Sequence, residues 1–162
     1  MNLDRAQQLA ETALDQHGLR NVGWTFAFDN ASRRMGSCQY TKQRITLSRK
    51  LTALNDEAQV LDTILHEIAH ALTPGHKHGP VWRRKAREIG ARPQACVSSK
   101  DVVTAPPPFS FECPECGQRI PRYKRPNPRR SFMCRDCHDA WKAGRAQKPA
   151  PLRVIEHRIR ER

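Results

Sequence analysis

The sequence predicts an α+β domain followed by a small cysteine-rich module. Three observations lead to this prediction: apolar residues at helical spacing, short alternating segments between the helical ones, and two close pairs of cysteines in the last third of the chain. The chain has 162 residues, of which 38% are hydrophobic, enough for one modest core and a small module. Charged residues or histidine interrupt every apolar run, so no segment is predicted to span a membrane.

The first half of the chain is predicted to begin with a helix and to continue as short strands. Apolar residues recur at helical spacing over residues 2–17, and Gly18 ends the pattern. Residues 24–28, 36–40 and 44–47 read as strands separated by turn residues. A small antiparallel meander is the simplest arrangement for these three strands.

Two further helices are predicted after the strands. Asn55 is placed to cap the first, whose wide apolar stripe continues to Leu72. The second begins at Pro80, because proline suits a first helical turn, and ends at Gly90. Together with the strands, these helices form the predicted α+β core.

Prolines 106–108 form a stiff spacer that divides the chain. We expect residues 1–104 to form the core, residues 105–143 to form a basic, cysteine-rich module, and residues 144–162 to form a basic tail. This tail is poor in apolar residues, which predicts either a mobile segment or a short basic helix.

The charge of the chain points to a polyanionic partner. Lys and Arg number 29 against 16 Asp and Glu, giving a net charge of +13 and a pI near 10.2. Residues 1–105 carry 15 basic and 10 acidic side chains, and residues 106–162 carry 14 and 6. The surplus is therefore concentrated in the C-terminal part, although a solvated basic surface without a partner would have the same composition.

The strongest chemical motif is His66-Glu67-Ile68-Ala69-His70, inside the predicted helix that ends at Leu72. The i, i+4 spacing points both imidazoles in one direction, so that they can bind one metal ion. A Zn²⁺ held by neutral ligands lowers the pKa of its bound water towards about 7, and the adjacent Glu67 can act as the general base. This motif predicts a zincin-like metalloprotease core that hydrolyses peptide bonds.

A third ligand is required, and His76 and His78 compete for the position. His76 has the spacing of the metzincin pattern, but that pattern needs glycine where this chain has Thr73. His78 directly precedes Gly79 and Pro80, where the chain turns into the next helix. We favour His78 for this reason and leave His76 as the alternative.

The second motif consists of two cysteine pairs, Cys113/Cys116 and Cys134/Cys137, separated by 17 residues. This spacing predicts a four-cysteine zinc ribbon with one structural Zn²⁺. Cys134 to His138 also fits the C-x-x-C-H pattern of haem attachment, but the presence of the other cysteine pair argues against haem. Cys38 and Cys96 have no neighbouring cysteine and are interpreted as small buried apolar residues.

Basic residues crowd the segment between the two cysteine pairs. Arg and Lys can neutralise phosphates while aromatic rings stack on unpaired bases, a combination suited to single-stranded or distorted DNA read without sequence preference. The predicted nucleic-acid-binding residues are Arg119, Arg122, Tyr123, Lys124, Arg125, Arg129 and Arg130. Phe132 and Trp141 are instead expected to pack around the zinc.

The chain resembles the SprT-like family, which includes the Spartan metalloproteases that degrade proteins crosslinked to DNA. The resemblance is carried by Trp24, Gly36–Cys38, Ile45–Leu47, Leu61–His70 and His78–Trp82, and it covers most of residues 1–92 in order. A zinc-binding module after the protease core is also a feature of many members.

The resemblance implies that His66, His70 and His78 are the catalytic zinc ligands and that Glu67 is the catalytic base. In the family the third histidine lies in a His-Gly-Pro turn before an aromatic residue, here Trp82. The resemblance also implies DNA-stimulated proteolysis of DNA-bound proteins and a role in the repair of DNA–protein crosslinks, which the spacing of the motifs does not show.

We therefore expect a zinc endopeptidase that acts on DNA-bound or DNA-crosslinked proteins and uses one catalytic and one structural Zn²⁺. The alternative is a non-proteolytic DNA-binding zinc protein associated with transcription or repair, and a weaker one is a peptidase without a nucleic-acid role. The segment Met1–Arg5 lacks the features of a secretory signal. We expect a cytoplasmic, nucleoid-associated protein, or a nuclear one if the source is eukaryotic, with no membrane partner.

Overall fold

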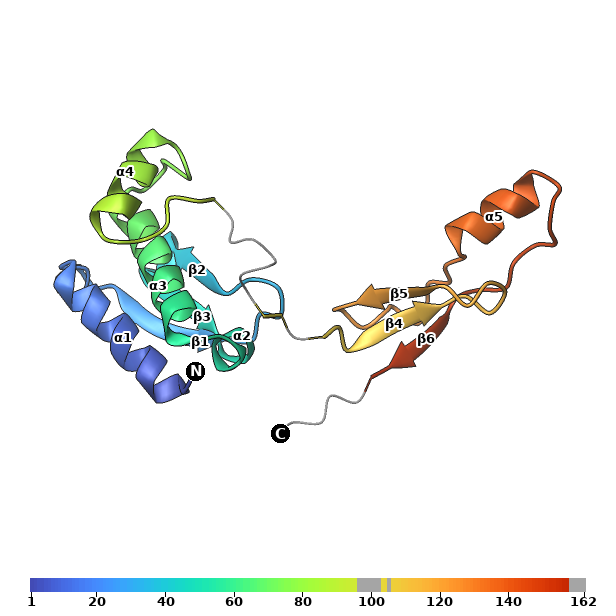
Figure 1. The fold of residues 1–162 in the computed structure, drawn as a ribbon, viewed down its shortest axis with the longest axis horizontal. Helices are drawn as coiled ribbons and strands as arrows, with labels where there is room; N and C mark the ends of the chain where they lie inside the picture. Colours follow the sequence, from blue (N-terminus) through green and yellow to red (C-terminus); the bar gives the residue numbers. More distant parts are fainter. Residues whose placement is uncertain (96–102, 105, 158–162) are drawn as a thin grey trace. The chain divides into compact units, whose positions relative to one another are not determined.

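The computed structural model describes residues 1–95, 103–104 and 106–157. It divides into an N-terminal unit, Met1–Ala105, and a C-terminal unit, Pro106–Arg162 (Figure 1). Both units combine helices with a small sheet, so the α+β class predicted from the sequence is confirmed. Among the described helices, none is both long and apolar enough to cross a lipid bilayer.

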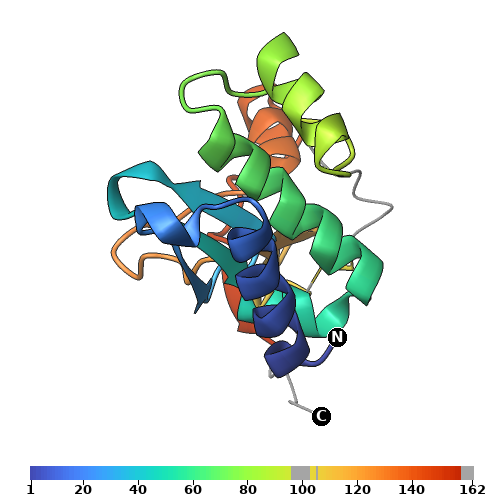
Figure 2. The ribbon, with the colours of Figure 1, turned by 90° about the vertical axis from the view of Figure 1, so that its left-hand side faces the viewer.

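Three long helices, one short helix and a three-stranded sheet are the main elements of the N-terminal unit. Helices α1 (Leu3–Gln16) and α3 (Glu57–Leu72) lie side by side over one face of the sheet, and α4 (Pro80–Glu88) packs against α3 (Figures 1 and 2). The shorter elements are η1 (Arg20–Val22), β1 (Thr25–Asp29), β2 (Gly36–Gln39), η2 (Tyr40–Lys42), β3 (Arg44–Ser48) and α2 (Arg49–Leu54).

The three main helices confirm the periodicities of the sequence, but the cap of α3 differs from the prediction. Asp56, and not Asn55, is the N-cap, and its carboxylate accepts a hydrogen bond from the amide of Gln59 at 2.8 Å. Asn55 is instead the C-cap of the unpredicted helix α2, and its side-chain amide donates to the carbonyl of Leu51. Helix α2 has only six residues, too few for a periodic pattern to predict it.

The sheet is not the predicted antiparallel meander. Its strand order is β1-β3-β2, with β1 parallel to β3 and β2 antiparallel to β3. Ile45 and Leu47 of β3 are at most 1% exposed, so the central position buries the most apolar strand. The segment between β1 and β2 leaves one position free in the sheet, and β3 returns to fill it. Strand β3 therefore lies between the other two and runs parallel to β1.

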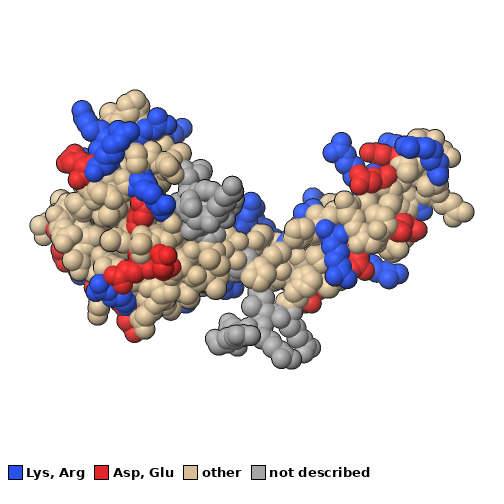
Figure 3. All heavy atoms as spheres, viewed as in Figure 1, with Lys and Arg blue, Asp and Glu red and all other residues tan. Residues whose placement is uncertain are grey.

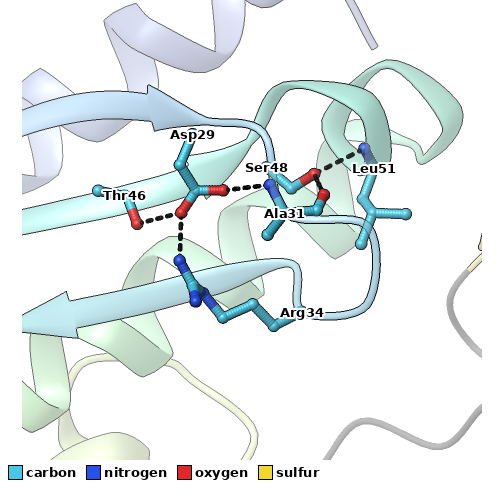
Figure 4. A network of polar contacts seen from close by, with 6 residues as sticks. All are labelled: Asp29, Ala31, Arg34, Thr46, Ser48 and Leu51. Carbon is cyan, nitrogen blue, oxygen red and sulfur yellow. Dashed lines mark hydrogen bonds and ion pairs between the residues drawn. The ribbon is translucent and has the colours of Figure 1, made fainter. Parts of the chain in front are cut away.

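A polar network holds this crossing segment in place (Figure 4). The carboxylate of Asp29 accepts hydrogen bonds from the amide of Ala31, the hydroxyl of Thr46 and the guanidinium of Arg34. The Ser48 hydroxyl donates to the Ala31 carbonyl and accepts from an amide in the first turn of α2. Burial alone would raise the pKa of Asp29, but its three donors outweigh this effect and hold the pKa below its usual value.

The apolar core of the N-terminal unit lies between the sheet and helices α1 and α3. Alanines line the side of α1 that faces the core, which lets the two helices approach closely. The fully buried large side chains of this core are Leu14, Ile45, Leu47, Leu51, Val60, Ile64 and Ile68. The core therefore fixes α3, the helix that carries the histidine motif.

The C-terminal unit contains a second small sheet and one helix. Strands β4 (Phe109–Glu112), β5 (Arg119–Arg122) and β6 (Arg153–Glu156) are antiparallel in the order β5-β4-β6, and α5 (Arg135–Lys142) precedes β6. Residues 153–156 were expected to form part of a tail or a short helix, and this expectation is wrong. Their backbone completes the β4 ladder, a long-range pairing that local composition does not reveal.

Candidate metal centres

The first candidate metal centre consists of three histidines at one end of α3 and the loop that follows. His66 and His70 lie one helical turn apart, and His78 approaches them from the loop. Nε2 of His78 lies 3.1 Å from Nε2 of His66 and 3.0 Å from Nε2 of His70. Three nitrogen atoms from residues up to 12 positions apart thus converge on one point.

The loop between α3 and α4 explains why His78 and not His76 takes part. It is built from successive turns, in which the amides of His76 and Gly79 donate to the carbonyls of Thr73 and His76. Lys77 has a positive φ of 45°, which reverses the chain just before His78. His76 is exposed and lies outside the three-histidine group.

Trp82 packs against all three histidines. Its ring centroid lies 4.7 Å from that of His66, 5.2 Å from that of His70 and 4.6 Å from that of His78. The indole is 0% exposed, in the first turn of α4. The buried ring therefore restricts the rotamers open to the histidines and holds their nitrogen atoms together.

The histidines are poised to be neutral, the state that binds a metal. Burial, followed by the charge of His78, lowers the pKa of His66 to about 4, and burial together with the other two histidines lowers the pKa of His70 to about 4. Burial also lowers the pKa of His78. In a tetrahedral zinc site with bonds of about 2.0–2.1 Å, ligand nitrogens lie roughly 3.3 Å apart, so the observed spacing fits Zn²⁺.

Glu67 lies between the two helical histidines in sequence and faces strand β2. It is 9% exposed, and the backbone amide of Cys38 donates a hydrogen bond to its carboxylate. Burial raises the pKa of Glu67 to about 7, against the smaller opposing effects of this hydrogen bond and of Arg34. A carboxyl group with this pKa can accept and release a proton near neutral pH.

Gly36 on β2 leaves the space that Glu67 occupies. A Cβ atom at this position would lie 2.8 Å from Cγ2 of Thr63 and 2.9 Å from Oε1 of Glu67. These distances are shorter than van der Waals contact, so only glycine fits without a shift of the Thr63 and Glu67 side chains or of the backbone that carries them. The sequence indicated Gly36 only through the family resemblance and gave no reason for it.

Two more β2-side residues line the same face of α3. The hydroxyl of Tyr40 donates to the carbonyl of His70 at 3.0 Å, which ties the end of β2 to the turn of α3 that carries His66 and His70. Cys38 is half-buried against the core, and burial, with the nearby Glu67 charge, raises the pKa of its thiol to about 12. A raised pKa favours the protonated thiol at neutral pH, and Cys38 packs against the apolar core although it is only half-buried and not fully buried as predicted. Cys96 lies outside the described residues.

The second candidate metal centre consists of the four cysteines of the C-terminal unit. Their sulfur atoms form one compact group, with 3.8 Å between Cys113 and Cys137 and 3.8 Å between Cys116 and Cys134. A tetrahedron with Zn–S bonds of about 2.3 Å has edges of roughly 3.8 Å, so the sulfur atoms fit Zn²⁺. Cys113 and Cys134 are buried, whereas Cys116 is exposed.

Local backbone geometry explains how the first cysteine pair turns around this point. Gly117 adopts a positive φ of 69°, and its amide donates to the carbonyl of Cys113 at 2.9 Å. The amide of Cys113 in turn donates to the carbonyl of Gln118. In the second pair, Cys134 is the N-cap of α5, so Cys137 follows one turn later on the helix.

The predicted nucleic-acid-binding residues lie on β5 and the loop that follows it. Lys124, Arg125, Arg129 and Arg130 are exposed, and Tyr123 is half-buried. Arg119 pairs with Glu112 at 2.6 Å, and the guanidinium of Arg122 stacks over Phe111 at 5.4 Å. Most of these cations therefore face solvent and are available to a polyanion.

The aromatic residues of this unit partly follow the expectation that they pack inward. Phe132 contacts the buried Phe111, with 5.6 Å between ring centroids, yet it remains 44% exposed. Trp141 lies half-buried on α5 beside His138, and Lys148 lies over its ring. Neither ring is fully enclosed.

Comparisons with known proteins agree with the resemblance in the sequence. The family model for the SprT-like family matches residues 4–101. A curated relative, Protein SprT-like from Lactiplantibacillus plantarum, is 29% identical over 138 residues, which cover 81% of this chain and 91% of the relative.

Two solved structures of archaeal metallopeptidase zymogens are also similar to this chain. Jannalysin of Methanocaldococcus jannaschii has a TM-score of 0.46 and 16% identity, and the match covers 59% of this chain and 85% of jannalysin. Abylysin of Pyrococcus abyssi has a TM-score of 0.42 and 20% identity, with 52% of this chain and 87% of abylysin covered.

Proposed function

Because this chain belongs to the SprT-like family, we propose that it is a zinc-dependent endopeptidase whose substrates are proteins bound or crosslinked to DNA, and that DNA stimulates it. Family membership and the two candidate metal centres support a zinc metallopeptidase. The DNA-related part of the proposal is supported by the net charge of +13 and by the exposed cations of the C-terminal unit.

One observation carries the peptidase proposal: three neutral imidazole nitrogens converge within 3.1 Å beside a buried carboxyl group with a raised pKa. A structural zinc site has four protein ligands, whereas a catalytic one has three and an open position. The group at His66, His70 and His78 contains three residues among those that the structure describes. This composition favours catalysis over a purely structural site.

The three histidines would hold the zinc ion, which when bound supplies a Lewis acid that polarises carbonyl and water oxygens. Glu67 is placed to receive the proton of the attacking water on a carboxylate oxygen and to pass it to the nitrogen of the leaving amine. Burial raises the pKa of Glu67, which suits both transfers near neutral pH. The Cys38 amide holds that carboxylate against β2 through a hydrogen bond, and Gly36 leaves the space for it because it has no side chain.

Strand β2 offers a place for the substrate backbone. It pairs with β3 on one side, and no other described strand pairs with its second side. An extended peptide can add to such an edge through main-chain hydrogen bonds, which give affinity with little side-chain selectivity. This mode would accommodate many protein substrates, and a requirement for DNA would restrict which of them are cleaved.

The proposal is tested by cleavage of a DNA-binding protein by the wild type and by Glu67→Gln at equal zinc content, with and without single-stranded DNA. Loss of the general base should lower the rate by about 10² to 10⁴-fold while zinc is retained. Cleavage by the wild type alone, and faster with DNA, is the expected result. Equal cleavage by both proteins would overturn the role of Glu67, and equal rates with and without DNA would overturn the stimulation.

The second candidate is a DNA-binding zinc protein without proteolytic activity. The exposed cations of the C-terminal unit favour it, since they do not depend on the histidine centre. The same experiment separates the two functions. Salt-sensitive DNA binding without cleavage by either protein would replace the peptidase with this second candidate.

A further inference from the structure

Helix α4 presents a row of arginines that the proposed chemistry does not use. Its nine residues include four basic side chains and one acidic side chain. Trp82 and Ala86 are buried against the unit, whereas Arg83, Arg84 and Arg87 are exposed on the other side of the helix. Figure 3 shows Lys and Arg gathered over the part of the N-terminal unit where α4 lies. We call Arg83, Arg84 and Arg87 the α4 patch.

The members of the α4 patch form no direct ion pair within the described structure. Lys85 pairs with Glu88 at 2.7 Å, the only acidic residue of the helix. Arg83, Arg84 and Arg87 have no hydrogen bond or ion pair with any described acidic residue, in contrast to Arg92, which pairs with Asp62. Arg84 acts on Glu88 only as a minor contribution, after Lys85, to the lowered pKa of that carboxyl group. The patch therefore presents three guanidinium groups without a direct partner among the described residues.

Two features of this arrangement are unfavourable within the helix itself, although Arg87 lies in the last turn, where the helix dipole favours a cation. Arg83 and Arg87 are four residues apart, a spacing at which like charges repel each other. Arg83 also lies in the first turn of α4, where the positive end of the helix dipole disfavours a cation. An anion bound to the patch would relieve both effects. Solvation of the side chains alone would not remove them.

The α4 patch borders the three-histidine centre. His78 lies two residues before α4 begins, and its ring packs against Trp82 of the same helix, with 4.6 Å between ring centroids. A ligand on this patch would lie beside the site where peptide cleavage is proposed.

We propose that the α4 patch is a nucleic-acid contact on the N-terminal unit, separate from the basic residues of the C-terminal unit. It would bind successive phosphates of a single strand. Arginine presents a planar fork of donors that matches phosphate geometry, and all three members of the patch are arginine. Their spacing along the helix gives a row of cations that fits the repeating charges of a nucleic-acid backbone.

This inference rests on the proposed function in naming DNA as the partner. It adds a position: the DNA strand would pass next to the histidine centre, so a protein attached to that strand would be held close to the cleavage site. The effect of DNA on cleavage would then come partly from an increased local concentration of substrate. Acidic peptides are the other polyanions that such a patch could attract, and the test includes them.

The test measures binding of a labelled single-stranded oligonucleotide to the full-length, zinc-loaded protein as a function of salt. The patch variant carries Arg84→Gln and Arg87→Gln, and the matched control carries Lys42→Gln and Lys50→Gln, which removes two exposed charges from η2 and α2 of the same unit. Two lost phosphate contacts should lower the slope of log K against log salt by about 1.4, and the affinity at 0.1 M salt by about 25-fold. Circular dichroism checks that every variant is folded.

The control should bind the oligonucleotide as the wild type does. A patch variant that matches the wild type in both slope and affinity would overturn the inference, and so would a patch variant whose only loss is in binding of polyglutamate. A third variant, with Arg122→Gln and Arg125→Gln, tests the contact proposed for the C-terminal unit. Loss of oligonucleotide binding in this variant alone would overturn the contact proposed for the α4 patch but would keep DNA as the partner in the proposed function. Absence of binding by the wild type would overturn both the α4 contact and DNA as the partner.

Discussion

The two units of this chain hold their candidate metal centres in different ways. In the N-terminal unit the histidines stand on a helix that is fixed by a sizeable apolar core, and a buried tryptophan supports them. In residues 106–157, the buried apolar positions are Phe111, Pro149 and the two cysteines Cys113 and Cys134. The three-histidine centre is therefore carried by a fold that apolar burial stabilises. The four-cysteine centre takes the place of an apolar core in its unit.

The difference indicates what each metal ion would do. A unit that cannot bury enough apolar surface needs another source of folding free energy, and a bound zinc ion supplies about 10–16 kcal/mol in small zinc modules at neutral pH. The N-terminal unit has no such need, so its centre is free to serve chemistry. The predictions that follow test this contrast, in order of decreasing effect.

The largest effect is expected from Cys134→Ser. Removal of one thiolate should abolish tight zinc binding by the C-terminal unit and unfold that unit, because few apolar contacts remain to hold it. Hydrogen exchange measured by mass spectrometry should show lost protection in peptides from residues 106–157 and unchanged protection in α1 and α3. His70→Ala is the matched change in the other centre. If it unfolds the N-terminal unit as well, the contrast between the two units is wrong.

A smaller but still large effect is expected from Trp82→Ala. The indole is fully buried, so truncation should lower the free energy of unfolding of the N-terminal unit by about 3–5 kcal/mol. The three histidines would also lose the ring that restricts them, and zinc affinity measured against a chelator should fall. Trp82→Phe keeps an aromatic ring and serves as the control. An alanine variant that is destabilised but binds zinc as tightly as the wild type would limit Trp82 to a packing role.

An intermediate effect is expected from Gly36→Ala. The new Cβ would overlap Thr63 and Glu67, which should cost about 1–3 kcal/mol of stability and displace the carboxylate. Displacement of a catalytic group by a fraction of an ångström to an ångström should slow cleavage by about 10- to 100-fold. Ser37→Ala changes the neighbouring position, whose side chain points to the opposite face of β2, and should leave both quantities nearly unchanged. Full activity of Gly36→Ala would contradict the close fit of Glu67 against β2.

The smallest effect is expected from Asp29→Asn in the network of Figure 4. Three donors hold the pKa of Asp29 below its ordinary value, so the carboxylate stabilises the fold above the unfolded-state pKa of about 3.9, and this contribution is lost as the pH falls through the folded-state pKa. At pH 7 the variant should be about 1 kcal/mol less stable than the wild type. Denaturant unfolding at several pH values should show the difference shrinking below about pH 4. Thr46→Val removes one donor and should lower the free energy of unfolding by less than Asp29→Asn does. If the stability difference between Asp29→Asn and the wild type does not depend on pH, the carboxylate charge is excluded as its cause.

Part of the fold could be predicted because the signals are local. The three main helices of the N-terminal unit follow from periodicity and from Gly18 and Pro80 at their ends. The strands were identified, but their order was predicted wrongly. A meander would place β2 in the middle, whereas burial of Ile45 and Leu47 places β3 there.

The candidate site shows the same division. Residues His66 and His70 share a helix, so their spacing alone brings them together. Each cysteine pair likewise forms a short turn that brings two sulfur atoms close. The choice between His76 and His78 depended on a loop conformation, and the close fit of Gly36 to Glu67 depended on contact between a strand and a helix that are far apart in sequence.

The sequence by itself therefore determined the three main helices of the N-terminal unit, the residues of the two candidate metal-binding motifs and the excess of positive charge, because each depends on residues a few positions apart or on composition. Only the tertiary structure decided the order of the strands, the pairing of β6 with β4, the position of Trp82 against three histidines and the exposed row of arginines on α4. These features depend on which distant segments pack together. Burial of apolar side chains and pairing of backbone groups across the whole chain select that packing.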